Sequence, residues 1–188
     1  MVMMLFGLFV FLGIHVVASL RGLRAKLITQ FGEATYKGFF SLLAVSGLLL
    51  TAYGFALWRA NGAPELWTPP RGLRHLTLLL MLFASIALVA AYVPSHIKAW
   101  LKHPMLVGVK IWALAHLLAN GDAASIVLFG AVLAWAVYDR IAVKRRGDPL
   151  PVAPNNFAGD ALVVGGGLVL YAALAYLFHP YVIGVPVM

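Results

Sequence analysis

The sequence contains no cysteine among its 188 residues. This absence excludes disulfide bonds, cysteine-ligated metal centres and haem attached through a C-x-x-C-H motif. Charged residues are also scarce, at 11% of the chain compared with about 25% in an ordinary soluble domain. A soluble fold of this length could not hide the apolar side chains that take their place, because much of any small domain is surface.

Apolar residues are abundant instead, at 63% of the chain with a mean hydropathy of +0.94. A helix needs about 20 apolar residues to cross a hydrocarbon core of ~30 Å. The sequence has such windows at 2–20, 37–58, 73–93, 104–120, 123–140 and 161–179. They predict an all-α polytopic bundle of about six transmembrane helices, with residues 1–188 as a single membrane domain. Asp122 is expected to cap the helix of the fifth window.

The net charge of +8 does not indicate nucleic-acid binding, because the basic residues form short clusters between the apolar runs. Lys and Arg concentrate in cytoplasmic loops of membrane proteins. The second loop carries Arg59, Arg71 and Arg74, whereas the first, third and fifth loops carry Arg21, Arg24, Lys26, Lys37, Lys98, Lys102, Lys110, Arg140, Lys144, Arg145 and Arg146. The odd loops are therefore predicted to be cytoplasmic, and both termini are predicted to lie on the outer face of the membrane. The partner implied by composition is the lipid bilayer.

Two of the six histidines lie inside apolar stretches, namely His15 and His116. An imidazole in lipid is costly and usually faces a partner. One histidine alone is well explained by an interhelical hydrogen bond to a Ser, Asn or backbone group. Two on separate helices favour a shared metal, and b-type haem needs only two facing imidazoles. The other four histidines are His75, His96, His103 and His179. They lie near span ends, where water or lipid headgroups can form hydrogen bonds with the imidazole. Helix-rise arithmetic leaves His15 with His103 as an alternative ligand pair.

One region of the sequence resembles a known family. It runs from His103-Pro104-Met105-Leu106-Val107-Gly108 through VKIWALAHLLANGD at 109–122 to Ala134-Trp135-Ala136 and Asp139-Arg140. These motifs closely resemble the NnrU family of bacterial membrane proteins. His15, followed by Leu20-Arg21 and Leu23-Arg24, is also similar to that family, so the resemblance spans most of the chain.

The resemblance implies a multi-pass protein of the bacterial inner membrane, so that both termini would be periplasmic. It also implies a link to denitrification, through production of nitrite and nitric oxide reductases. The family is also related to 15-cis-ζ-carotene isomerase, an integral membrane haem b enzyme. Carried over from that enzyme, the haem iron ligands are His15 and His116, the same two residues that burial selects. The isomerase has a cysteine near the second histidine that exchanges as a ligand. Ala113 takes that position here, which puts isomerase activity in doubt.

A second resemblance belongs to another functional class. Lys102 to Gly108 is similar to the Arg-His-Pro-x-Tyr-x-Gly element of membrane methyltransferases that use S-adenosylmethionine, such as isoprenylcysteine carboxyl methyltransferase. This resemblance implies that His103 lies near S-adenosylmethionine. Pro104 and Gly108 have a simpler explanation, because proline suits the first turn of a helix and glycine lets a neighbouring helix approach closely. A non-catalytic membrane assembly or interaction protein is the third class. The leading prediction is a haem b protein of the NnrU type that senses nitric oxide or redox state or acts on a lipophilic substrate.

Overall fold

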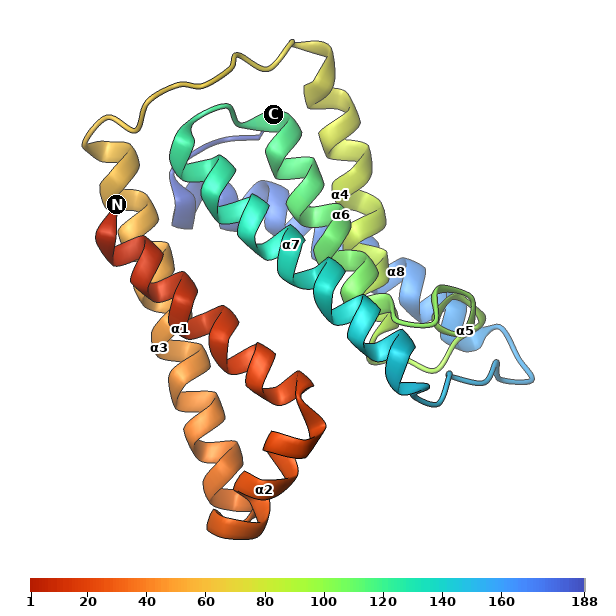
Figure 1. The fold of residues 1–188 in the computed structure, drawn as a ribbon. Helices are drawn as coiled ribbons and strands as arrows, with labels where there is room; N and C mark the ends of the chain where they lie inside the picture. The colour runs from red at the N-terminus through yellow and green to blue at the C-terminus, as the bar shows by residue number, and fades with distance from the viewer. Residues whose placement is uncertain (188) are drawn as a thin grey trace. The chain divides into compact units, whose positions relative to one another are not determined.

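The computed structural model describes residues 1–187, and this part of the chain is built from helices joined by turns and loops (Figure 1). Its elements are α1 (Val2–Ser19), α2 (Arg21–Phe31), α3 (Glu33–Ala60), α4 (Gly72–Ala90), α5 (His96–Leu101), α6 (Pro104–Ala119), α7 (Ala123–Arg146), α8 (Ala158–Ala173) and the π-helical η1 (Leu174–Ile183). Within the described residues, extended pairing is limited to an isolated bridge between Glu65 and Asp122. The all-α prediction is confirmed.

The apolar helices have the length and surface of membrane-spanning segments. Among the described residues, α1, α3, α4, α7 and the run from Ala158 to Ile183 are each long and apolar enough to cross a membrane. Only 17–28% of the residues in these windows are buried, so most of their apolar side chains point outward. On α3, for instance, Phe39 and Leu49 are 62% and 63% exposed. Surfaces of this kind need lipid around them, and the protein is a multi-pass membrane protein.

The fourth predicted span, 104–120, matches α6 to within one residue, and with 16 residues α6 is shorter than the helical runs that could span a membrane. Elsewhere the boundaries differ from those predicted in two ways. α2 and α5 occupy the first and third loops, where the sequence indicated only interfacial segments. α7 continues beyond residue 140 to Arg146, where three basic residues in its last turn complement the negative end of the helix dipole. Hydropathy windows detect only the lipid-facing part of a helix, which explains these extensions.

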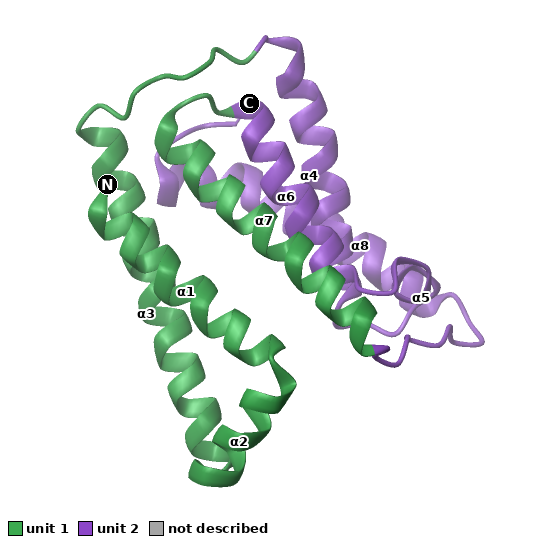
Figure 2. Cartoon of the chain, in the orientation of Figure 1, with its two compact units in different colours: residues 1–69, 120–146 green, residues 70–119, 147–188 purple. Residues whose placement is uncertain are grey.

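The chain folds into two compact units (Figure 2). Unit 1 comprises residues 1–69 and 120–146, and therefore contains α1, α2, α3 and α7. Unit 2 comprises residues 70–119 and 147–188, and contains α4, α5, α6, α8 and η1.

In unit 1, α1 packs along α3 through glycines (Figure 1). A Cβ added at Gly47 would lie 2.7 Å from the backbone nitrogen of Phe11, and one at Gly7 would lie 2.5 Å from that of Thr51. A Cβ at Gly54 would collide with the backbone of Met4. Small residues allow membrane helices to approach this closely, and van der Waals contact then holds them together.

Asp122 connects the start of α7 to the loop that follows α3. Its carboxylate accepts the Ser125 backbone N–H at 2.9 Å and the Ser125 hydroxyl at 2.7 Å, which confirms the predicted cap. The same carboxylate lies 3.5 Å from Nε of Arg59, at the end of α3. In addition, the Ala123 N–H donates to the carbonyl of Pro64 at 2.9 Å. These bonds fix α7 to the rest of unit 1.

In unit 2, α4 is the central helix and packs against both α6 and α8. A Cβ at Gly108 of α6 would lie 2.9 Å from Cγ of Leu88, and one at Gly167 of α8 would lie 2.7 Å from Cα of Ile86. α8 continues into η1, which carries Pro180. Proline lacks an N–H and clashes with the carbonyl four residues earlier, so a wider π-helical turn accommodates it.

Candidate functional site

His15 lies near the end of α1 in unit 1, and its ring is anchored to its own helix. Its Nδ1 lies 2.6 Å from the carbonyl oxygen of Phe11, one turn earlier. A carbonyl oxygen only accepts hydrogen bonds, so Nδ1 carries the proton and the lone pair lies on Nε2. Metal-binding histidines commonly have this arrangement, because the bond fixes both the tautomer and the orientation of the ring.

Aromatic rings from three helices surround His15. The centroid distances are 4.5 Å to Phe11 of α1, 5.2 Å to Phe40 of α3 and 5.4 Å to Trp135 of α7. The indole nitrogen of Trp135 is buried, and none of the described residues forms a hydrogen bond with it. The buried hydroxyl of Tyr36 is likewise without such a partner. Tyr36 lines an apolar pocket of about 340 Å³ together with Phe40 and Ile14, the residue before His15.

His116 has the same local arrangement in unit 2. Its Nδ1 lies 2.8 Å from the carbonyl oxygen of Trp112, so this nitrogen also donates and Nε2 holds the lone pair. The Trp112 ring lies 5.1 Å from the His116 ring by centroid. His15 and His116 thus share one local geometry, although they belong to different units.

His179 is the functional candidate that the sequence interpretation missed. It was expected to reach water at the end of the last span, but its ring centroid lies 6.2 Å from that of His116, with the planes 23° apart. Its Nδ1 lies 2.8 Å from the carbonyl oxygen of Leu174, five residues earlier. His179 precedes Pro180, and the helix was expected to end there. Because η1 continues to Ile183 as a π-helix, His179 is held within the helix instead.

His103, the alternative ligand, lies in the turn between α5 and α6, outside the helix that carries His116. The preceding Lys102 has a φ of +63°, which non-glycine residues rarely adopt. Pro104 is the first residue of α6, and Gly108 fits closely against α4. Helix initiation and packing therefore account for the proline and glycine of the methyltransferase-like element.

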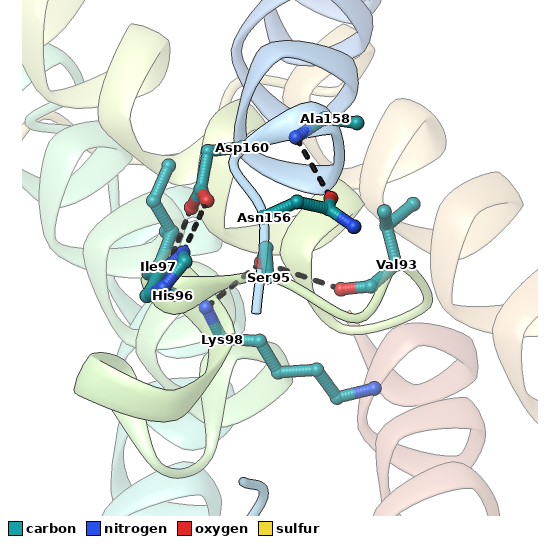
Figure 3. Close-up of polar contacts among 8 residues, drawn as sticks. All are labelled: Val93, Ser95, His96, Ile97, Lys98, Asn156, Ala158 and Asp160. Carbon is teal, nitrogen blue, oxygen red and sulfur yellow. Dashed lines mark hydrogen bonds and ion pairs between the residues drawn. The ribbon is translucent and has the colours of Figure 1, made fainter. Parts of the chain in front are cut away.

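His96 belongs to a polar clamp between α5 and α8 (Figure 3). Its Nδ1 lies 2.7 Å from Oδ2 of Asp160, while Oδ1 of Asp160 accepts the Ile97 N–H at 2.9 Å. The Ser95 hydroxyl accepts the Lys98 N–H at 3.0 Å and so caps α5. A six-residue helix has little stability of its own, and this clamp holds it in place. His75, in contrast, is exposed at the start of α4.

A groove of about 800 Å³ lies in unit 1, where α1 passes into α2 beside α7. Arg21, Arg145 and Arg146 line it together with apolar residues that include Leu23 and Ile141. Nη1 of Arg146 donates to the carbonyl of Ser19 at 3.0 Å. Cations beside an apolar wall suit an amphiphile with an anionic headgroup.

Comparison with models of known protein families identifies the family of this chain. The family model described as NnrU protein matches residues 3–187, which is almost the whole sequence. The chain belongs to the NnrU family. No curated protein and no solved structure matches it.

Among residues 1–187, no group of three or more His, Cys, Asp or Glu side chains is placed to hold a metal ion. A porphyrin supplies four nitrogens itself and needs only one or two axial ligands from the protein. His15 and His116 have the tautomer required for this role, and the buried Trp135 N–H and Tyr36 hydroxyl are polar groups that a bound molecule would satisfy.

Proposed function

We propose that this protein lies in a bacterial inner membrane and binds haem b, which the imidazole nitrogens of His15 and His116 would hold. Membership of the NnrU family supports a denitrification-linked membrane protein at the family level. In this proposal the protein supports the production of nitrite and nitric oxide reductases, either by responding to nitric oxide or redox state or by acting on a lipophilic substrate.

The observation that carries the haem proposal is the shared geometry of the two imidazoles. Each lies within an apolar helix, and each donates its Nδ1–H to the carbonyl four residues earlier, at 2.6 Å for His15 and 2.8 Å for His116. This bond raises the basicity of the ring and orients Nε2 as the ligating nitrogen.

The residues around His15 determine the polarity and the water access of the proposed haem site. Haem, when bound, would supply an iron centre that changes oxidation state. Phe11, Phe40 and Trp135 pack around His15 and partly cover its ring. Low local polarity and restricted water access are the means by which a protein tunes such a centre. The groove lined by Arg21, Arg145 and Arg146 supports the alternative of a lipophilic substrate with an anionic end.

The test is the absorption spectrum of detergent-purified protein from haem-replete cells, recorded as reduced minus oxidised. We expect a Soret band in the wild-type protein. His15→Ala and His116→Ala should each shift the band or abolish it, because each removes one axial nitrogen. His75→Ala is the matched control, since His75 is exposed and should leave the spectrum unchanged. A colourless but fully folded wild-type preparation would contradict the proposal.

A further inference from the structure

We infer that the groove between the α1–α2 junction and α7 binds one anionic phospholipid, with the phosphate at its arginines and an acyl chain along its apolar wall. The inference goes beyond the proposed function, because it names the class of amphiphile that this groove holds and does not depend on haem. All the residues that line the groove belong to unit 1. The site is therefore complete within one compact unit.

The wall that α7 contributes lies on one face of that helix. The residues of α7 at this wall include Tyr138, Ile141, Ala142 and Arg145. They are spaced three, four and seven positions apart, and residues at these spacings lie on the same side of a helix. Seven residues extend about 10 Å along the helix axis. Over that length the face changes from the apolar Ile141 and Ala142 to the cationic Arg145, which is the order of an acyl chain and its headgroup.

The end of α1 and the start of α2 form the other wall. Leu20 and Leu23 line it and are 45% and 41% exposed, while Ile141 of α7 is 46% exposed. Covering these apolar side chains with an acyl chain is favourable. Gly22 also lines the groove, and a Cβ added there meets nothing within 4 Å. The groove is consequently open at a position where a larger side chain would fill it without displacing a neighbour.

The charges at the groove favour an anionic headgroup. Arg21, Arg145 and Arg146 contribute positive charge, whereas none of the described residues that line the groove is acidic. Nη1 of Arg146 donates to the carbonyl oxygen of Ser19 at 3.0 Å, which joins α7 to the end of α1 and fixes this side of the site. Guanidinium groups suit the geometry of phosphate oxygens. A phospholipid of net negative charge supplies both this phosphate and the acyl chain that the apolar wall suits.

Lipid binding by the full-length protein tests this site. The protein is purified in a neutral detergent, delipidated and titrated with dioleoyl phosphatidylglycerol or dioleoyl phosphatidylcholine, which share their acyl chains and differ in net charge. Native mass spectrometry gives an apparent Kd for the first bound lipid. The variants are Arg145→Gln and Gly22→Leu. The control Lys144→Gln removes the same charge one residue away on α7, outside the groove, and the control Gly38→Leu alters a second glycine whose Cβ would meet nothing within 4 Å.

We expect the wild type to bind one phosphatidylglycerol at least about tenfold more tightly than phosphatidylcholine. Arg145→Gln should weaken phosphatidylglycerol binding about fivefold, the factor that one basic residue contributes at an anionic surface. Lys144→Gln should change it less than about twofold, because salt at ~0.15 M screens a charge outside the groove. Gly22→Leu should weaken the binding of both lipids, since its side chain takes the place of the acyl chain, and Gly38→Leu should weaken neither. Thermal unfolding identifies a variant that has not folded, and Gly22→Leu decides if Arg145→Gln is such a variant.

Three results would overturn the inference. Equal losses in Arg145→Gln and Lys144→Gln would show that surface charge in general attracts the lipid. If Gly22→Leu binds like Gly38→Leu, the acyl chain does not lie in the groove. Displacement of phosphatidylglycerol by glycerol 3-phosphate would assign the arginines to a soluble anion instead.

The Soret band of the same wild-type protein, recorded before delipidation, separates this inference from the proposed function. A colourless wild type that still selects phosphatidylglycerol would contradict the haem proposal alone. A coloured wild type that binds both lipids equally would contradict this inference alone.

Discussion

Individual polar side chains in the apolar helices are mostly satisfied by the helix that carries them. The Thr51 and Ser85 hydroxyls donate to carbonyls four residues earlier, at 2.7 Å and 2.9 Å. His15 and His116 do the same with Nδ1. A hydroxyl is fully satisfied as a donor by such a bond, whereas an imidazole keeps a second nitrogen. The histidines are therefore the residues that retain a capacity for chemistry after local hydrogen bonding.

Asp122 allows a test of residue-scale energetics in unit 1. We expect Asp122→Ala to lower the free energy of unfolding by about 1–2 kcal/mol, because the cap on Ser125 is lost. Asp122→Asn should cost less, since the amide oxygen still accepts the N–H although the charge facing Arg59 is gone. Denaturant unfolding in detergent micelles measures both. Equal losses in the two variants would assign the stabilisation to the ion pair rather than to the cap.

Helices of this protein associate through glycine contacts, and these contacts position the site. In unit 1, Gly47 lies against the backbone of Phe11, whose carbonyl holds the His15 ring. The approach of α3 to α1 thus bears directly on where His15 lies. A larger side chain introduced between α1 and α3 would therefore move His15 as well as disrupt the packing of the two helices.

Gly54 and Gly13 form a matched pair for testing this packing. A Cβ at Gly54 would collide with the backbone of Met4, whereas a Cβ at Gly13 meets nothing within 4 Å. We expect Gly54→Leu to destabilise the protein by at least about 2 kcal/mol, since overpacking against rigid backbone typically costs 1–3 kcal/mol. Gly13→Leu should be neutral within about 0.5 kcal/mol. Thermal unfolding in detergent compares the two, and equal effects would contradict the packing described for α1 and α3.

At the scale of the whole molecule, the distribution of basic residues predicts its orientation in the membrane. By the predicted windows, the second loop carries three Lys and Arg residues and the odd loops carry the other eleven of the fourteen. The structure places Lys37, Lys110 and Arg140 of these eleven within α3, α6 and α7. From the positive-inside rule we expect the odd loops to lie in the cytoplasm. The loop before α4 and the loop after α7 lie on opposite sides of the bilayer if α4, α6 and α7 all cross it. They lie on the same side if α6, which has only 16 residues, does not cross.

The absence of cysteine makes this orientation testable with single cysteine variants. Leu66, in the second loop, is 61% exposed and Val152, in the fifth, is 88% exposed. We expect a membrane-impermeant maleimide to label Leu66→Cys in spheroplasts, and Val152→Cys only after the membrane is disrupted. Labelling of both sites in intact spheroplasts would show that α6 does not span. The opposite pattern would invert the predicted topology.

The sequence by itself determined the class of fold, because lipid exposure requires long apolar windows and those windows are visible in the residues. It also selected His15 and His116, since an imidazole inside an apolar stretch stands out without any structure, and it identified the Asp122 cap from its position. Only the tertiary structure brought His179 beside His116. Hydropathy does not encode the rotation of a helix about its axis, and a hydropathy window does not show that the helix continues past Pro180 as a π-helix and so keeps His179 within it.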